Sequence, residues 1–171
     1  MKRDAASLTC AQIAAIVLIL VILPVMKLFH FLLHLLFGGI FIYAGALKAM
    51  DPGVFVMDVR SFDLLPDPYA AWLAMGLPWL EIFTGFTVIT GLFRQGGLLV
   101  LNISLLIFLA AIGISWYRGI DIQCGCFGGS GDAKSNYITL ILRDLALLAL
   151  GGYLQIVAIG TALSRRRPAQ G

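Results

Sequence analysis

The sequence has 171 residues, of which 60% are hydrophobic and only 12% are charged. A soluble domain carries about 25% charged residues, and a soluble fold of this size would expose far more apolar surface than monomers tolerate. The net charge of +3 is spread over loops and ends, so the sequence lacks the clustered basic face of a nucleic-acid-binding protein.

The first apolar run is short and lies close to the N-terminus. Residues 11–26 read AQIAAIVLILVILPVM, which makes a helix of about 24 Å at about 1.5 Å per residue. No small-residue cleavage site follows, so a cleaved signal peptide is not indicated. We expect residues 1–28 to be an uncleaved N-terminal segment that forms an extra short span, with Pro24 and Lys27 in the turn to the next helix.

Four longer runs follow, and each is long enough to cross a bilayer, which takes about 20 apolar residues. With no water to bond the backbone, each run should be helical. The sequence therefore predicts an all-α integral membrane protein, with residues 29–163 as one four-helix transmembrane bundle. The four runs are 29–50, 70–92, 97–116 and 137–163.

The polar segments between the runs predict an orientation. Lys and Arg accumulate in cytoplasmic loops, and the tail, residues 164–171, carries three consecutive arginines. This places the C-terminus in the cytoplasm of a multi-pass protein of the bacterial inner membrane. Counting back, the loop at 51–69, with four aspartates, and the loop at 118–136 should both lie outside.

The loop before the last run contains two of the three cysteines, in DIQCGCFGGSGD at 121–132. Residues two apart in an extended segment lie about 6–7 Å apart, at the upper limit for a disulfide, and Gly125 lets the chain bend. Such a ring would be strained and would exchange readily, and its contribution to stability would be small. Cys124 and Cys126 are therefore candidates for a redox pair. The alternatives are two inert thiols in a glycine-rich turn, or a soft-metal site that would need further ligands.

One acidic residue lies deep within an apolar run. Glu81 is preceded by Pro78, which removes a helical hydrogen bond, and ionisable groups at such depth are functional candidates. A proton relay is one role for Glu81. The alternative is a structural partner of Lys48 or Arg143.

Four stretches together resemble the MauE/DoxX-type redox-associated membrane proteins, of which the methylamine-utilisation MauE family is the named branch. They are LLFGGIFIYAGALKAMDP, LPWLEIFTGF, GIDIQCGCFGG and ITLILRDLALL, and the resemblance covers residues 29–160. The Cys-Gly-Cys-Phe-Gly stretch is its most specific part. The resemblance implies a four-helix membrane core, and it matches Cys124 and Cys126 to the cysteine pair of the family.

The methylamine branch is linked to maturation of the disulfide-rich small subunit of periplasmic methylamine dehydrogenase, alongside a thioredoxin-like partner. The resemblance thus implies a thiol–disulfide redox protein whose outward-facing pair works with a thioredoxin-like protein and supports maturation of a secreted, disulfide-bonded client enzyme. The chain has no second cysteine pair, so electrons would stay on the outer face, pass to another subunit or pass to a lipid quinone, which is the candidate cofactor. We assign no metal ligands. A non-enzymatic assembly or docking subunit and a copper or mercury carrier are the competing functions.

Overall fold

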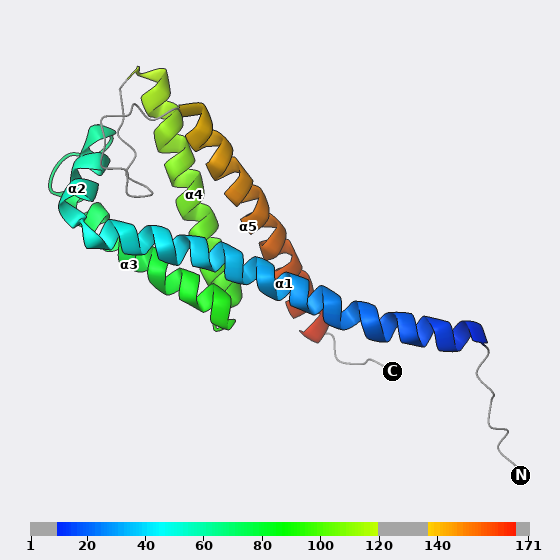
Figure 1. The fold of residues 1–171 in the computed structure, drawn as a ribbon. Coiled ribbons are helices and arrows are strands. Elements are labelled where there is room, and N and C mark those ends of the chain that lie inside the picture. The colour runs from blue at the N-terminus through cyan, green and yellow to red at the C-terminus, as the bar shows by residue number, and fades with distance from the viewer. Residues whose placement is uncertain (1–9, 120–136, 167–171) are drawn as a thin grey trace, which may run out of the picture. The chain divides into compact units, whose positions relative to one another are not determined.

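The structure is a computed structural model that describes residues 10–119 and 137–166 (Figure 1). These residues form five α-helices: α1 (Cys10–Met50), α2 (Pro52–Ser61), α3 (Tyr69–Thr90), α4 (Arg94–Tyr117) and α5 (Tyr137–Arg166). Four segments are long and apolar enough to cross a membrane: Ile22–Met50, Tyr69–Thr90, Arg94–Tyr117 and Tyr137–Ser164. The prediction of an all-α integral membrane protein is confirmed, and the four segments agree with the four long runs of the sequence.

Helix α1 begins well before the first predicted long span at residue 29. It runs without interruption from Cys10 to Met50, with Pro24 inside it. The turn predicted at Pro24 and Lys27 is therefore wrong; a helix in lipid tolerates proline when neighbouring groups satisfy the freed carbonyl. That residues 11–26 cross the membrane as an extra span stays a prediction. The chain divides into two compact units, Met1–Leu33 and His34–Gly171. The bundle described below is the second unit.

Helix α2 occupies the first half of the segment predicted to be a loop at 51–69. Asp51 caps its N-terminus, with its side chain accepting a hydrogen bond of 3.3 Å from the amide of Val54, and Pro52 occupies the first turn. Both are favoured residues at these positions. Residues preceding proline disfavour the helical conformation, which explains why α1 ends at Met50 and a new helix starts at Pro52.

Glycines allow α1 and α3 to cross closely. A Cβ atom added to Gly38 would lie 2.7 Å from the carbonyl oxygen of Gly85, and one added to Gly85 would lie 2.7 Å from the carbonyl oxygen of Gly38. A Cβ atom on Gly45 would likewise lie 2.7 Å from the carbonyl oxygen of Pro78. Small residues at such crossings are typical of membrane helices, whose backbones associate by close packing.

The remaining helices complete the bundle by packing in chain order. Helix α2 packs against α3, α3 against α4, and α4 against α5; Figure 1 shows α4 and α5 running side by side. At one end, the Trp116 ring near the end of α4 stacks on the Tyr137 ring at the start of α5, with centroids 6.5 Å apart. We call this end of the bundle the connecting end, because α4 ends and α5 begins there.

Side chains are distributed as expected for a protein dissolved in lipid. Large apolar residues such as Phe83, Ile107 and Ile156 are exposed, whereas Glu81 and Asp144 are buried. Charged groups in lipid are costly and therefore face the interior of a helix bundle. Glu81 and Asp144 within the spans thus face the interior, whereas large apolar side chains face outward.

Candidate functional site

Two deeply buried charges of the bundle form an ion pair between α1 and α3. The ammonium nitrogen of Lys48 lies 2.7 Å from Oε1 of Glu81 and 2.7 Å from Oε2. The exposed fractions of the two side chains are only 3% and 2%. An ion pair so far from water is stabilising only when its geometry is good, and here the ammonium group contacts both carboxylate oxygens.

Two aromatic rings lie near the Lys48 ammonium group. The nitrogen lies 5.3 Å from the ring centroid of Phe55 on α2 and 5.1 Å from that of Phe108 on α4. A cation within about 6 Å of an aromatic face is attracted to it. Helices α1, α2, α3 and α4 therefore all contribute to the surroundings of a single charge.

Local sequence explains how this pair forms. Lys48 belongs to the last turn of α1, and Glu81 lies near the middle of α3, three residues after Pro78. The contact between Gly45 and the Pro78 carbonyl brings the two backbones together. The long Lys48 side chain then reaches Glu81 across the crossing.

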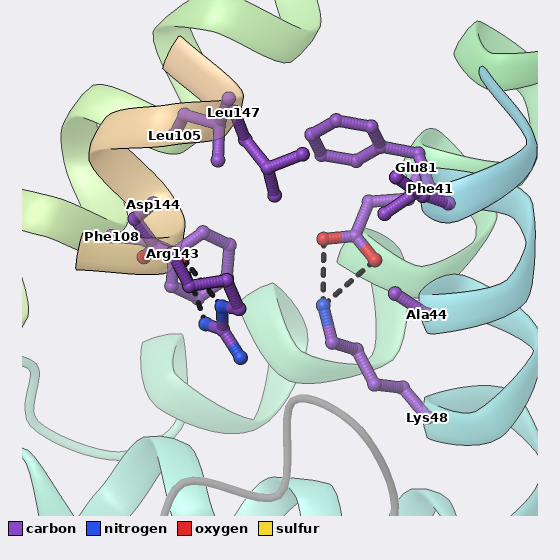
Figure 2. A pocket seen from close by; sticks show the side chains of 10 residues that line it. Phe41, Ala44, Lys48, Glu81, Leu105, Phe108, Arg143, Asp144 and Leu147 are labelled. Atoms are coloured by element: carbon purple, nitrogen blue, oxygen red, sulfur yellow. Dashed lines mark hydrogen bonds and ion pairs between the residues drawn. The ribbon is translucent and has the colours of Figure 1, made fainter. Parts of the chain in front are cut away.

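A second ion pair from α5 faces the same space. Arg143 lies 2.8 Å from Asp144 through its Nη2 nitrogen and 2.9 Å through its Nε nitrogen. Both pairs line a cavity of about 40 Å³ (Figure 2), whose apolar wall includes Phe41 and Leu105. A cavity needs at least about 10–15 Å³ to hold a water molecule, so this one has room for a small number of water molecules between the two pairs.

The four charges sum to zero, which limits what the cavity can do chemically. Such a site does not select cations or anions by net charge. Carboxylates and an ammonium group around a water-sized space can instead store and pass protons. Among the residues that the structure describes, no group of three His, Cys, Asp or Glu side chains could hold a metal ion.

The structure locates some of the predicted site residues. Glu81 pairs with Lys48, one of the two partners named for a structural role, whereas Arg143 pairs with its neighbour Asp144. The proton-relay role of Glu81 stays a prediction. Cys124 and Cys126 lie outside the described residues.

Sequence reasoning gave no role in this site to Asp144, Phe55 or Phe108. The adjacent Arg143 and Asp144 inside an apolar run were a usable signal, because two opposite charges at this depth should neutralise each other. Nothing in the sequence marks the two phenylalanines among its eleven.

Contacts at the connecting end fix both flanks of the cysteine-bearing segment. Besides the Trp116–Tyr137 stack, Arg118 donates hydrogen bonds of 3.0 Å to the carbonyl oxygen of Asp63 and 3.2 Å to its carboxylate. The α2–α3 connection and the end of α4 therefore meet at this end. Arg143 follows Tyr137 by six residues, or about 9 Å of helix, so the charged cavity lies close beneath it.

Comparisons with known proteins agree with the resemblance. The chain matches the family described as methylamine utilisation protein MauE over residues 26–160. It is 30% identical over 138 residues to the methylamine utilization protein MauE of Paracoccus denitrificans, an alignment that covers 80% of this chain and 71% of the relative. No solved structure matches. The chain therefore belongs to the MauE family of membrane proteins linked to methylamine utilisation.

Proposed function

We propose that this protein is a membrane thiol–disulfide redox protein whose reactive pair is Cys124 and Cys126. The pair exchanges with a thioredoxin-like protein outside the cytoplasmic membrane and supports maturation of a secreted, disulfide-bonded enzyme. Membership of the MauE family supports a role in methylamine utilisation. A dehydrogenase of methylamine is accordingly the first client to test.

One observation carries this proposal. Both flanks of the segment that holds the cysteines are anchored at the connecting end, by the Trp116–Tyr137 stack and by the Arg118–Asp63 ion pair. A bundle that anchors both ends of the cysteine-bearing connection between α4 and α5 suits a redox partner that must dock and leave. A disulfide between residues two positions apart closes a very small loop and adds little to the stability of the fold. Stabilisation therefore does not explain the cysteine pair.

We include Glu81 in the proposal as a proton relay that acts together with Lys48. Thiol–disulfide exchange proceeds through thiolates, so protons leave and return in each cycle. The buried pair and the water-sized cavity beside it provide a place for a proton near the connecting end. Glu81 would act on the rate and its pH dependence and would not contact the sulfur atoms.

Thiol labelling in intact bacteria tests the redox pair. A bulky, membrane-impermeant maleimide is applied to cells that express the Cys10→Ser variant, with and without mild reduction. We expect two labels per chain after reduction and none before it. Labels that appear only after lysis would place the segment in the cytoplasm and overturn the proposal.

Partner exchange is tested with single-cysteine variants. Cys124→Ser and Cys126→Ser should each trap a thioredoxin-like protein as a mixed disulfide, which a reductant releases, and the double variant should trap none. Client disulfides that form equally well with the double variant would contradict the redox role and favour a docking subunit. The relay is tested by Glu81→Gln, which should shift the pH profile of exchange. Arg60→Gln, in an exposed ion pair, is the matched control.

A further inference from the structure

A second cavity lies beside the charged one, and the proposed function does not use it. Its volume is about 390 Å³, and it is bounded by α2, the α2–α3 connection, α3 and α4. Most of its lining is aliphatic, as with Leu73, Leu77 and Ala111, and Phe62 and Phe108 supply two aromatic rings. Binding sites for small molecules commonly have about 300–1,000 Å³ and an apolar, aromatic lining with few polar groups.

The position of this cavity sets what can enter it. The α4 residues that line it run from Ser104 to Ile114, which lie about 5 to 20 Å along the helix from its end at Tyr117. Half of the hydrocarbon core is about 15 Å thick, so most of this lining lies in the leaflet on the side of the connecting end. Ile107 and Ala110 in its wall are exposed on the lipid-facing surface. A ligand would therefore arrive from the bilayer.

We propose that this cavity binds a prenylated quinone, which accepts the electrons of Cys124 and Cys126. This inference rests on the proposed function. The chain has three cysteines in all, so a second dithiol cannot carry electrons onward within it. A quinone is a flat, apolar two-electron carrier that dissolves in lipid, and the cavity offers it aromatic faces for stacking.

One polar group in the described lining suits the reduced ligand. Ser104 is buried, and its hydroxyl donates a hydrogen bond of 3.0 Å to the carbonyl oxygen of Val100. The lone pairs of its oxygen then remain to accept a hydrogen bond from a quinol hydroxyl. Phe108 lines both cavities, so its ring borders the quinone space and also the cavity beside the Lys48–Glu81 pair.

The reaction balances without another reactant. Two S–H bonds break at Cys124 and Cys126, and one S–S bond forms between the sulfur atoms. The two electrons and two protons that leave the thiols convert the two ring carbonyls of the quinone into hydroxyls. The dithiol is oxidised, the quinone is reduced to quinol, and the disulfide formed can oxidise the thioredoxin-like partner.

The first test uses the purified, reduced full-length protein in anaerobic detergent solution with decylubiquinone. We expect one quinol per protein, measured by the loss of quinone absorbance, together with loss of two free thiols. The Cys124→Ser/Cys126→Ser variant should form none. A pair that exchanges disulfides with a thioredoxin-like protein but yields no quinol would overturn the quinone inference and leave the proposed function standing. A pair that neither exchanges nor yields quinol would overturn both.

The second test locates the site. Ala110→Phe fills the cavity wall, and Ala149→Phe adds the same ring at an exposed position of α5 outside it. Because steric changes in an apolar pocket alter recognition about 10–200-fold, Ala110→Phe should raise the quinone concentration that gives half the maximal single-turnover rate at least about tenfold, while oxidation of the pair by diamide is unchanged. Equal effects of the two variants would contradict a quinone site in this cavity.

A direct measurement covers the case in which Ala110→Phe does not fold. An azido-quinone is photolysed with the unmodified protein, and the labelled peptides are identified by mass spectrometry. Labels on the α3 and α4 residues that line the cavity support the inference. Labels elsewhere, or a cavity that retains only phospholipid acyl chains and excludes the probe, overturn it.

Discussion

Lys48 and Glu81 form an ion pair of 2.7 Å at side-chain exposures of 3% and 2%, whereas Arg60 and Asp67 form one of 3.1 Å at exposures of 44% and 56%. The same kind of attraction therefore operates in two different surroundings within one chain. In water the pair is screened and contributes little. In the bundle interior each charge depends on its partner. The two pairs allow the cost of burial to be measured within one protein.

The first prediction concerns this buried ion pair. Replacing Glu81 with Leu leaves the Lys48 ammonium group buried without a counter-charge, which should destabilise the bundle by about 3–5 kcal/mol. Arg60→Leu, which breaks the exposed pair, should cost less than about 1 kcal/mol. Equilibrium unfolding of the full chain in mixed micelles measures both.

A double substitution separates the charge from the packing. Lys48→Met together with Glu81→Leu removes both charges and keeps side chains of similar volume, so most of the lost stability should return. A double variant as unstable as Glu81→Leu alone would show that packing around Glu81, and not the uncompensated charge, caused the loss.

The second prediction concerns the crossing of α1 and α3. Gly38→Ala and Gly85→Ala each place a methyl group against a backbone carbonyl that cannot move aside alone, and overpacking of this kind typically costs about 1–3 kcal/mol. Gly39→Ala and Gly76→Ala lie on the same two helices with open space at the added Cβ atom. They should be neutral or slightly stabilising in the same unfolding measurement. Equal losses at all four positions would contradict a close crossing.

The membrane spans could be predicted from sequence because lipid demands long apolar helices, and that signal is read directly from composition. Helix α2 could not be predicted in this way. It combines buried Phe55 and Asp58 with exposed Arg60, so it has no apolar run. Its start signal, Asp51 followed by Pro52, also ends the preceding helix. One dipeptide thus marks both a helix end and a helix start.

The site was harder to predict because pairing depends on how helices cross. By position in its run, Lys48 lies near a helix end and Glu81 near a helix centre, which suggests different depths in the membrane. The close approach of Gly45 to the Pro78 carbonyl brings the two helices together near that end. Sequence spacing within one helix carries no information about its tilt against another. The sequence alone therefore could not decide whether Lys48 or Arg143 is the partner of Glu81.

The third prediction is an asymmetry within the second ion pair. The exposed fraction of the Arg143 side chain is 28%, whereas that of Asp144 is 4%. Arg143→Leu therefore leaves a buried carboxylate uncompensated, while after Asp144→Leu the arginine can extend its long side chain towards the membrane surface. Arg143→Leu should be the more destabilising change, by about 1–3 kcal/mol. Equal losses for the two variants, measured by unfolding in micelles, would contradict this account.

The fourth prediction concerns the cap of α2. Asp51→Ala removes the side-chain acceptor for the Val54 amide and should cost about 1 kcal/mol, because alanine is a poor N-cap. Asp51→Asn and Asp51→Ser keep an acceptor and should lose much less. Phe55, which contacts the Lys48 ammonium group, belongs to the first turn that the cap holds. We expect the loss of the cap to loosen this turn and the rest of α2 without unfolding the other helices. Hydrogen exchange by mass spectrometry should therefore show faster exchange of the α2 amides in Asp51→Ala and unchanged exchange in α4 and α5. Faster exchange throughout the bundle would mean that α2 unfolds together with the transmembrane helices and not as a separate local unit.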